Sequence, residues 1–448
     1  MFPYFLPTAT SVRCALCRVA IALPIILSFA YPLAHGEEAL GIDQAVRLAE
    51  AWSRQLVADD AGAAAARAMA VSAGALPDPV LKAGVNNLPV DGADRFSLTR
   101  DFMTMRSIGI AQELTRSDKR KARSARFERE AELAEAERGL ALLELRRETA
   151  FAWLDRHYQE RLRDLLREQR AETALQVEAA EAAYAGKRGS QTDVLAARTA
   201  GAQIEDRQQD VESRIATAQV RLARWIGAAA DRPLGPLPEL DLAWIERRDV
   251  SEVVKRHPRL VVMLREEEVT RAEAAIAKSS KRADWSIELT YSQRGPAFSN
   301  MASFGVSIPL QVDPGHRQDR DIAAKLALAD RIRERQEETR RELAAGIRSD
   351  LLRWRSLQDR IARFDRSQVP LAAKRSTGEV ASYRGGGSSL ASALAARRLE
   401  IDTRLERLRL EMDMAALWVR LEYLLPAADR NNPESPAGPS AAFKEYLP

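Results

Sequence analysis

The chain contains the sequence YAGKRGSQTDVL at residues 184–195 and the related sequence YRGGGSSLASAL at residues 383–394. Each begins with a tyrosine, runs through glycines and a serine, and leads into an alanine-rich segment. The residues before each sequence are poor in proline, with none from 117 to 184 and only Pro370 from 318 to 383. At 1.5 Å per residue, each stretch predicts a helix about 100 Å long. Each tyrosine sequence therefore predicts a turn between a very long helix and a second helix.

Apolar residues recur at three- and four-residue intervals on the second long helix, and the first long helix has a looser version of this pattern. The second carries Leu343, Ile347, Leu351, Trp354, Leu357, Ile361 and Phe364, and the first carries Leu140, Leu143, Phe151, Leu154, Leu162 and Leu165. Narrow stripes on otherwise charged helices pack against neighbouring helices as in coiled coils. A proline inside a helix removes one hydrogen bond and kinks the axis, so Pro370 predicts a bend that tapers the helical assembly. A break into two shorter helices is the alternative.

Two pairs of short segments alternate apolar and polar residues with the period of two that marks β-strands. The pattern is clearest at 285–292 and 303–310, and a weaker pair lies within 80–114. Each segment has about the ten residues that a tilted strand needs to cross a bilayer. The alternation alone fits equally well a small hairpin subdomain whose apolar face packs inward on the helices.

The elements occur twice in the same order, which indicates an internal duplication. We expect a helix at 43–75, a strand pair at 80–114, the long helix at 117–184 and a helix at 190–226. The second set is a helix at 250–283, a strand pair at 285–311, the long helix at 318–383 and a helix at 388–425. The domains are thus a first repeat at 37–226, a proline-rich connector at 227–249, a second repeat at 250–425 and a loosely ordered tail at 426–448.

Residues 1–36 have the order of a secretory signal peptide. Arg13 and Arg18 precede an apolar run at 19–34, and small residues follow before the first acidic ones. A membrane anchor is the alternative, but the run is short and contains Pro24. Both cysteines lie in this segment, and its removal changes the net charge from +4 to +2. The mature chain would contain no disulfide, and its charge gives no reason to expect nucleic acid as a partner.

Four strands cannot close a membrane barrel, and an open sheet edge cannot remain in lipid. Three copies of the chain would supply 12 strands, an even number within the range of bacterial barrels. Their long helices would gather into a hollow tube. This fold class is mostly α with a membrane β-barrel: a trimeric 12-stranded barrel continued by an α-helical barrel in the periplasm.

This plan and the two turn sequences resemble the TolC family of outer-membrane efflux factors over essentially the whole mature chain. The family's turn has an aromatic residue, a glycine, a small residue and then Asp-Val-Leu, as in Tyr184, Gly186, Ser190 and Asp193–Leu195. The resemblance implies a homotrimer in contact with outer-membrane lipid that extends into the periplasm. It also implies a periplasmic adaptor and an inner-membrane proton-driven transporter as partners, and a passive exit duct rather than an enzyme.

Strings bordering the first strand pair resemble the metal-efflux branch of the family, of cobalt–zinc–cadmium and copper–silver type. They are LPDP at 76–79, NLP at 87–89, DFMTM at 101–105 and IGIAQEL at 108–114. The cargo they imply is heavy-metal cations. A drug or small-molecule duct of the same family is the alternative cargo class, and a periplasmic coiled-coil scaffold is the alternative from another class. The duct predicts that the apolar strand faces meet lipid, whereas the scaffold predicts that they are covered.

The resemblance also assigns roles at the two turns. Asp193 and Tyr383 match the family pair that latches neighbouring helix pairs at the periplasmic gate. Tyr184, Gly186, Ser190, Gly386, Ser389 and Ser392 match the turn and adaptor-contact positions. Two departures stand out. Lys187 occupies the place of the family's first-turn glycine, and Ser392 and Ala395 stand where the family carries acidic residues. The constriction is then set by Tyr383 and the glycines.

No cofactor, resident metal or catalytic centre is predicted. His157, His257 and His316 are far apart in sequence, and no pair has the spacing of a metal site on one helix. Met103 and Met105 share a strand face and invite a soft-metal interpretation, but a barrel or loop contact is the favoured role. No phosphate-binding loop, nucleotide fingerprint or activated nucleophile is present.

Overall fold

The computed structural model describes residues 39–431, and the predicted signal peptide lies outside this range. The first half contains α1 (Ile42–Trp52), α2 (Arg54–Gly74), β1 (Val80–Asn86), β2 (Met105–Leu114), α3 (Ser117–Ala185) and α4 (Gln191–Ile226). The second half contains α6 (Val250–Lys255), α7 (Pro258–Ser279), β3 (Trp285–Gln293), β4 (Met301–Ser307), α8 (Gln318–Arg363), the π-helical turn η2 (Phe364–Gln368), α9 (Val369–Arg384) and α10 (Leu390–Glu422). The 3₁₀ turn η1 (Gly227–Asp231) and α5 (Ala243–Glu246) connect the halves, and α11 (Ala427–Asn431) follows them.

The predicted order of elements is present in both halves, but the first helix of each half is interrupted. Ser53 has an extended backbone, and its hydroxyl accepts a hydrogen bond from the Leu56 amide at 3.3 Å, which starts α2 afresh. In the second half His257 caps α7 in the same way, and Pro258 occupies the first helical position. Each interruption is a capped restart, because the capping side chain replaces the hydrogen bonds that a new helix leaves open.

The four strands form one antiparallel sheet in the order β1-β2-β3-β4. The register places apolar residues opposite one another across all four strands, as in the row Leu81, Ile110, Leu289 and Phe304. Glycine, serine, threonine and charged residues alternate with this row and occupy the other face. The sheet therefore has one apolar and one polar face, and β1 and β4 are its two edges.

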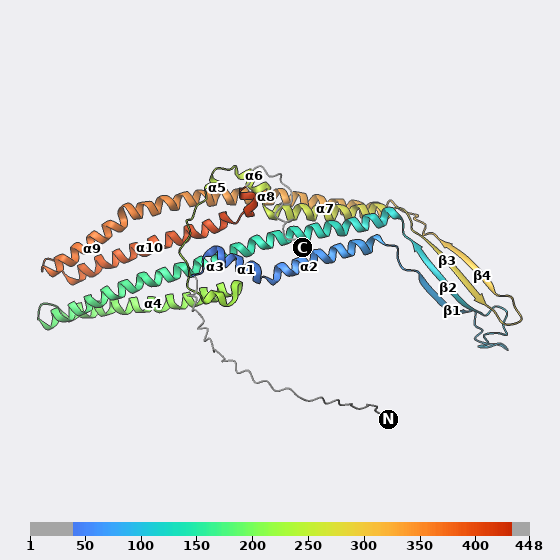
Figure 1. Ribbon diagram of the computed structural model, residues 1–448, viewed down its shortest axis with the longest axis horizontal. Helices are drawn as coiled ribbons and strands as arrows, with labels where there is room; N and C mark the ends of the chain where they lie inside the picture. Colours follow the sequence, from blue (N-terminus) through green and yellow to red (C-terminus); the bar gives the residue numbers. More distant parts are fainter. Residues whose placement is uncertain (1–38, 432–448) are drawn as a thin grey trace, which may run out of the picture. The chain divides into compact units, whose positions relative to one another are not determined.

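The helices pack in pairs along their length (Figure 1). α3 contacts α2 and α7 toward the sheet and α4 beyond the middle, while α8 contacts α7 and α9 contacts α10. The predicted stripe on the second long helix faces these neighbours, since Ile347, Leu351, Trp354, Leu357 and Phe364 are buried. The narrow stripe thus packs against neighbouring helices as predicted.

The core lies where the two halves and the connector meet. Trp153 and Trp354 are almost fully buried there, and the Trp153 indole donates a hydrogen bond to the Leu40 carbonyl at 2.8 Å. The connector joins this core, with Leu242 and Ile245 buried in it. The chain before α1 is tied to the connector because the Leu40 amide donates to the Pro233 carbonyl at 2.8 Å.

The first residues of the predicted tail differ from the expected loose order. They form α11, and Arg248 donates to the Asp429 carbonyl at 3.1 Å.

The second long helix continues through Pro370. The turn η2 ends at Gln368, two residues before the proline, and the Val369 amide donates to the Phe364 carbonyl five residues back. A wider turn moves the preceding carbonyls away from the proline ring and accommodates the missing amide proton. The alternative of two helices separated by a break is therefore wrong. The ribbon changes direction between α8 and α9 (Figure 1).

Within residues 39–431, no helix combines the length and the apolar character required to cross a membrane.

Candidate functional site

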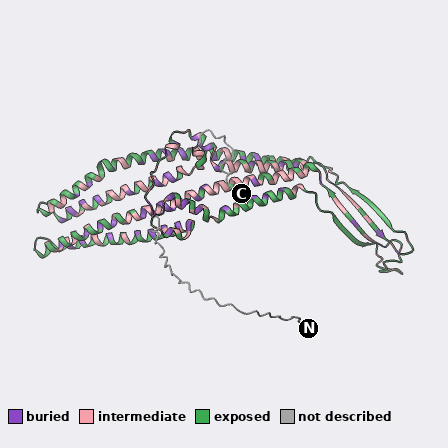
Figure 2. Ribbon diagram, viewed as in Figure 1, coloured by how far each residue is buried: buried purple, intermediate pink, exposed green. Residues whose placement is uncertain are grey.

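The apolar face of the sheet is open. Leu81 and Phe304 expose 70% and 71% of their surface, and Ile108 and Leu289 in the two inner strands expose more than half. Figure 2 shows β1 and β4 exposed along their length. The scaffold hypothesis requires this face to be covered by the helices, and within the described part of the chain it is not. A contiguous exposed apolar surface of this kind marks contact with a membrane or another protein.

The polar face carries an ion pair that spans the middle of the sheet. The Lys82 ammonium on β1 lies 2.6 Å from a Glu288 carboxylate oxygen on β3, so the pair crosses over β2. Gly109 lies beneath this crossing, and a β carbon there would stand 2.5 Å from the Thr290 hydroxyl. The small residue in β2 therefore allows polar side chains of its neighbours to meet. Both members of the ion pair are exposed, as expected for groups that face water.

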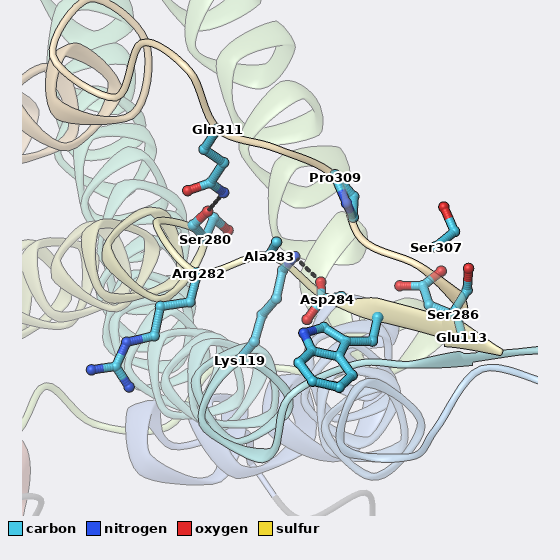
Figure 3. A pocket seen from close by; sticks show the side chains of 11 residues that line it. Glu113, Lys119, Ser280, Arg282, Ala283, Asp284, Ser286, Ser307, Pro309 and Gln311 are labelled. Carbon is cyan, nitrogen blue, oxygen red and sulfur yellow. Dashed lines mark hydrogen bonds and ion pairs between the residues drawn. The ribbon is translucent and has the colours of Figure 1, made fainter. Parts of the chain in front are cut away.

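A second ion pair joins the sheet to the helices. The Lys119 ammonium at the start of α3 lies 2.5 Å from the Asp284 carboxylate, just before β3 (Figure 3). The Arg116 amide donates to the same carboxylate at 3.0 Å. Partial burial raises the pKa of Asp284, but the hydrogen bonds from Lys119 and Arg116 outweigh it and hold the pKa below its usual value. An open pocket of about 330 Å³ lies beside this pair, with acidic and basic side chains in its wall. The pair fixes one half of the duplication to the other.

At the opposite end of the sheet the two hairpin loops interlock. The Arg294 guanidinium donates to the Phe102 carbonyl at 3.0 Å, and a β carbon on Gly295 would overlap the Thr99 carbonyl. Sequence reasoning missed this contact, which joins residues almost 200 positions apart. Met103 lies exposed in the first loop and Met105 begins β2 opposite Asn86.

The first helical turn is built around Ser190 and Asp193. Ser190 caps α4, with its hydroxyl accepting from the Asp193 amide at 3.1 Å, and the Asp193 carboxylate accepts from the Ser190 amide at 3.1 Å. The Ser190 hydroxyl also donates to that carboxylate at 2.8 Å. These bonds, the hydroxyl's first, lower the pKa of Asp193. The arrangement is a capping box, which satisfies open amides at the helix start.

The second turn has the same backbone path. Lys187 and Gly386 occupy matching positions, and both have positive φ, of 58° and 78°. The amides of Arg188 and Gly387 each close the turn on a carbonyl five residues back at 2.8 Å. Ser389 caps α10 as Ser190 caps α4, by accepting from the Ser392 amide at 3.2 Å.

The predicted turn positions are mostly open to solvent. Tyr184, Gly186, Ser190, Gly386 and Ser389 are exposed, and Ser392 is half-buried. The Ser392 hydroxyl donates to a Glu379 carboxylate oxygen at 2.9 Å, across the turn from α10 to α9. At Ser392 the family carries an acidic residue and this chain does not, but the Glu379 carboxylate lies beside Ser392. Ala395 is exposed on the next turn of α10.

The two predicted latch residues lie on neighbouring hairpins without a mutual hydrogen bond in the described residues. Tyr383 packs against a small cluster that contains Ala180, Val194 and Leu390. Val194 is adjacent to Asp193, but the Asp193 carboxylate is bound by Ser190. The matching Tyr184 is half exposed. The tyrosines of the two halves therefore have different surroundings: Tyr383 packs against a cluster to which both hairpins contribute, whereas Tyr184 is exposed.

A buried ionic cluster joins the hairpins above the turns, and sequence reasoning missed it. Glu400 on α10 is 3% exposed and accepts from Arg397 at 2.5 Å and Arg404 at 2.7 Å. Arg397 also pairs with Glu172 on α3. Glu400 is one of several glutamates that alternate with arginines on a charged helix, and nothing in the sequence distinguishes it as a buried residue.

The three histidines are dispersed. His157 stacks on Trp153 with ring centroids 5.2 Å apart, His257 caps α7, and His316 lies 3.0 Å from an Asp313 carboxylate oxygen. Burial lowers the pKa of His257 to about 4, and the nearby charges of Arg259 and Arg147 act in the same direction. Residues 39–431 contain no group of three or more histidine, cysteine, aspartate and glutamate side chains placed to hold a metal ion.

By sequence, no protein-family model and no curated protein matches the chain. By structure, it is similar to the outer-membrane channel OprN, with a TM-score of 0.72 and 17% identity over 85% of this chain and 89% of that one. It is also similar to CusC, described for its folding and transmembrane channel formation, with a TM-score of 0.70 and 15% identity over 86% and 92% of the two chains. The outer membrane protein VceC of Vibrio cholerae gives 0.70 and 18% over 86% and 95%.

At these identities the likeness establishes the fold. The chain has the fold of outer-membrane channels, and the predicted mostly helical channel fold is confirmed at that level. TM-scores of 0.70 to 0.72 do not separate CusC from the other two, so the similarity does not distinguish one branch of channels from another.

Proposed function

We propose that this chain, which has the fold of outer-membrane channels, is the exit duct of a tripartite efflux pump and works as a homotrimer of the TolC family. The observation that carries the proposal is the sheet, which has an exposed apolar face and two unpaired edges. An uncovered apolar face suits lipid, but the backbone groups along β1 and β4 must find partners before the sheet can enter a bilayer. A neighbouring copy supplies them.

Three copies satisfy both edges at once. If β4 of each copy pairs with β1 of the next, the three sheets close into one barrel of 12 strands and no edge remains. The apolar row then faces lipid, and the Lys82–Glu288 ion pair faces the water-filled lumen. A larger number of copies also closes a ring, but three is the number implied by the resemblance of the two helical turns.

The helices continue the duct. At 1.5 Å per residue, the 69 residues of α3 extend about 100 Å from the sheet to the first turn. We place this length in the periplasm, with the turns toward a periplasmic adaptor and a proton-driven transporter in the inner membrane. The residues before 37 serve as the export signal in this proposal. The role is passive and requires neither catalysis nor a cofactor.

The proposed cargo is heavy-metal cations, on the strength of the strings around the first strand pair. A conducting duct needs weak contacts, because tight ligands would retain the ion. The polar sheet face and Glu379 beside Ser392 offer single carboxylates rather than a chelating set. They suit passage of a cation better than its storage.

We further propose that Tyr383 and Asp193 close the periplasmic entrance. Tyr383 already contacts the hairpin that carries Asp193 through the cluster around Val194. To form the latch, the Asp193 carboxylate must accept the Tyr383 hydroxyl in addition to, or in place of, the Ser190 hydroxyl. A carboxylate has room for several donors, so the capping box and the latch are compatible.

Disulfide cross-linking of the sheet edges tests the proposed assembly. The predicted mature chain has no cysteine, so the two introduced thiols are the only ones that can form a disulfide. Ala83→Cys on β1 is combined in turn with Ala302→Cys and Val306→Cys on β4, all on the apolar face. Oxidation of outer membranes should give cross-linked dimers and trimers with at least one pair. Ser303→Cys points to the other face and serves as the matched control. Monomers alone, or equal cross-linking through Ser303→Cys, would refute the edge pairing.

A further inference from the structure

The apices of the two helical hairpins present cations that form no ion pair with the described part of the chain. Lys187 and Arg188 in the first turn and Arg384 in the second are exposed, and within residues 39–431 none of them forms an ion pair. The acidic side chains nearest the two turns are engaged: Asp193 with Ser190, Glu181 with Arg198 at 2.7 Å, and Glu379 with Ser392. The unpaired charge at the apices is therefore positive.

The backbone at Lys187 has a conformation that glycine would adopt more easily than lysine. Its φ of 58° lies in the left-handed region, which glycine adopts freely and lysine disfavours. The matching position of the second turn carries Gly386 with φ 78° and makes the same closing hydrogen bonds. Glycine would thus form this turn without strain. A strained residue at an exposed apex points to a function that the fold alone does not require.

The apices lie far from the apolar sheet, because α3 runs from the sheet at Ser117 to the first turn at Ala185, about 100 Å. They are thus outside the level of the membrane that the sheet would occupy. No described segment covers them. Lysine and arginine at such a site form charge-assisted hydrogen bonds with carboxylates, and complementary charge orients the encounter of two proteins.

We infer that Lys187, Arg188 and Arg384 form a basic docking tip that binds an acidic turn at the end of the periplasmic adaptor. This inference rests on the proposed function and names the chemistry by which the duct recognises its partner. Each copy presents three cations, and a trimer presents them around its rim. The first turn supplies two of the three, so it contributes more of the recognition than the glycine-rich second turn.

The test uses the full-length mature trimer in detergent and the purified adaptor, identified by site-specific photo-cross-linking from position 386 in cells. Binding is measured at about 50 and 300 mM NaCl, between which charge screening strengthens markedly. Lys187→Gly and Arg188→Ser should each weaken binding about tenfold at low salt and much less at high salt. Lys187→Arg keeps the charge and should bind within about twofold of the original. Because glycine fits the turn, Lys187→Gly should retain the unfolding temperature of the original.

Lys121→Ser is the matched control, since Lys121 is exposed and outside the described ion pairs but lies at the sheet end of the same helix. It should leave binding unchanged. If the adaptor binds the original and Lys187→Gly Arg188→Ser equally well, or binds independently of salt, the basic tip is refuted while the duct stands. If the purified adaptor does not bind at all, both proposals fail. Charge-dependent binding to phosphatidylglycerol vesicles without charge-dependent binding to the adaptor would assign the tip to a lipid surface and also refute the inference.

Discussion

Arginine substitutions at two adjacent positions of β4 distinguish a lipid-facing sheet from one exposed to water. Phe304 lies on the apolar face, 71% exposed, and pairs with Leu289, the middle residue of β3. In the proposed barrel it stands near the centre of the bilayer. Ser303, its neighbour in sequence, is also exposed but belongs to the polar face that would line the lumen.

The two environments predict very different costs. An arginine that faces lipid at the bilayer midplane destabilises a barrel by about 2–4 kcal/mol, or about 6–12 kcal/mol for the three copies of a trimer. An arginine on a water-exposed surface changes stability by about 0.5 kcal/mol or less. Phe304→Arg should therefore be costly and Ser303→Arg nearly neutral. Phe304→Ala is the reference for the first, so that the lost contacts of the ring are not counted.

The assay is urea-dependent folding into phospholipid vesicles, followed by the change in electrophoretic mobility between folded and heated protein. We expect Phe304→Arg to be less stable than Phe304→Ala by at least about 2 kcal/mol per copy. A difference below about 0.5 kcal/mol would refute a lipid-facing position for Phe304. Equal losses of stability for Ser303→Arg and Phe304→Arg would also refute it, because the two faces of β4 would then lie in the same environment.

Three further outcomes are expected. Tyr383→Phe and Asp193→Ala should each raise the resting conductance of trimers in a planar bilayer, with little further increase in the double variant. Ser190→Ala disturbs the capping box alone and should leave the resting conductance unchanged. Wild-type conductance in both single variants would refute the latch. Deletion of the gene should sensitise cells to zinc, cadmium, cobalt, copper or silver more than to dyes or detergents, and the reverse profile would indicate a drug-efflux duct. The pKa of His257 is lowered to about 4 from an unfolded value near 6.5, so its contribution to stability is complete above pH 6.5 and is lost as the pH falls toward 4, by at most about 3 kcal/mol. His257→Asn, which can still cap α7, should reduce the fall in unfolding temperature between pH 7 and 4.5. If the unfolding temperature falls as much in the variant as in the original, His257 is not the cause of the fall.

The duplicated order of helices and strands was predictable because each element follows from local pattern. The strands repeat with a period of two and the long helices lack proline, so neither depends on knowing the tertiary fold. The offset of 199 residues between Tyr184 and Tyr383 also aligns the two turns residue by residue. It pairs Lys187 with Gly386, and the backbone places both at positive φ.

The interruptions of the first helices had weaker signals. Ser53 sits between helix-forming segments, and the sequence alone did not indicate that it caps a new helix rather than facing solvent within one. His257-Pro258 is a stronger marker, because proline favours the first helical position. The turn η2 before Pro370 was likewise hidden, since a widened turn uses the same residues as an ordinary helix.

Contacts between distant residues could not be predicted from one sequence. Glu379 and Ser392 form a hydrogen bond because the turn between α9 and α10 has a particular length and path. The residue types alone do not predict that the two will be partners. The contact of Gly295 with Thr99 depends on how two loops from different halves fold together. The sequence also could not predict whether the apolar sheet face is exposed, because alternation determines which residues share a face but not what lies against that face.

The most direct test of the central claim is the mass and location of the native protein. Membranes from cells that express it at its natural level are separated, and the mass of the detergent-extracted protein is measured by native mass spectrometry. The account predicts a particle of three mature chains in the outer-membrane fraction that falls to single chains only on heating. A monomer released with the periplasmic contents in the absence of detergent would contradict it.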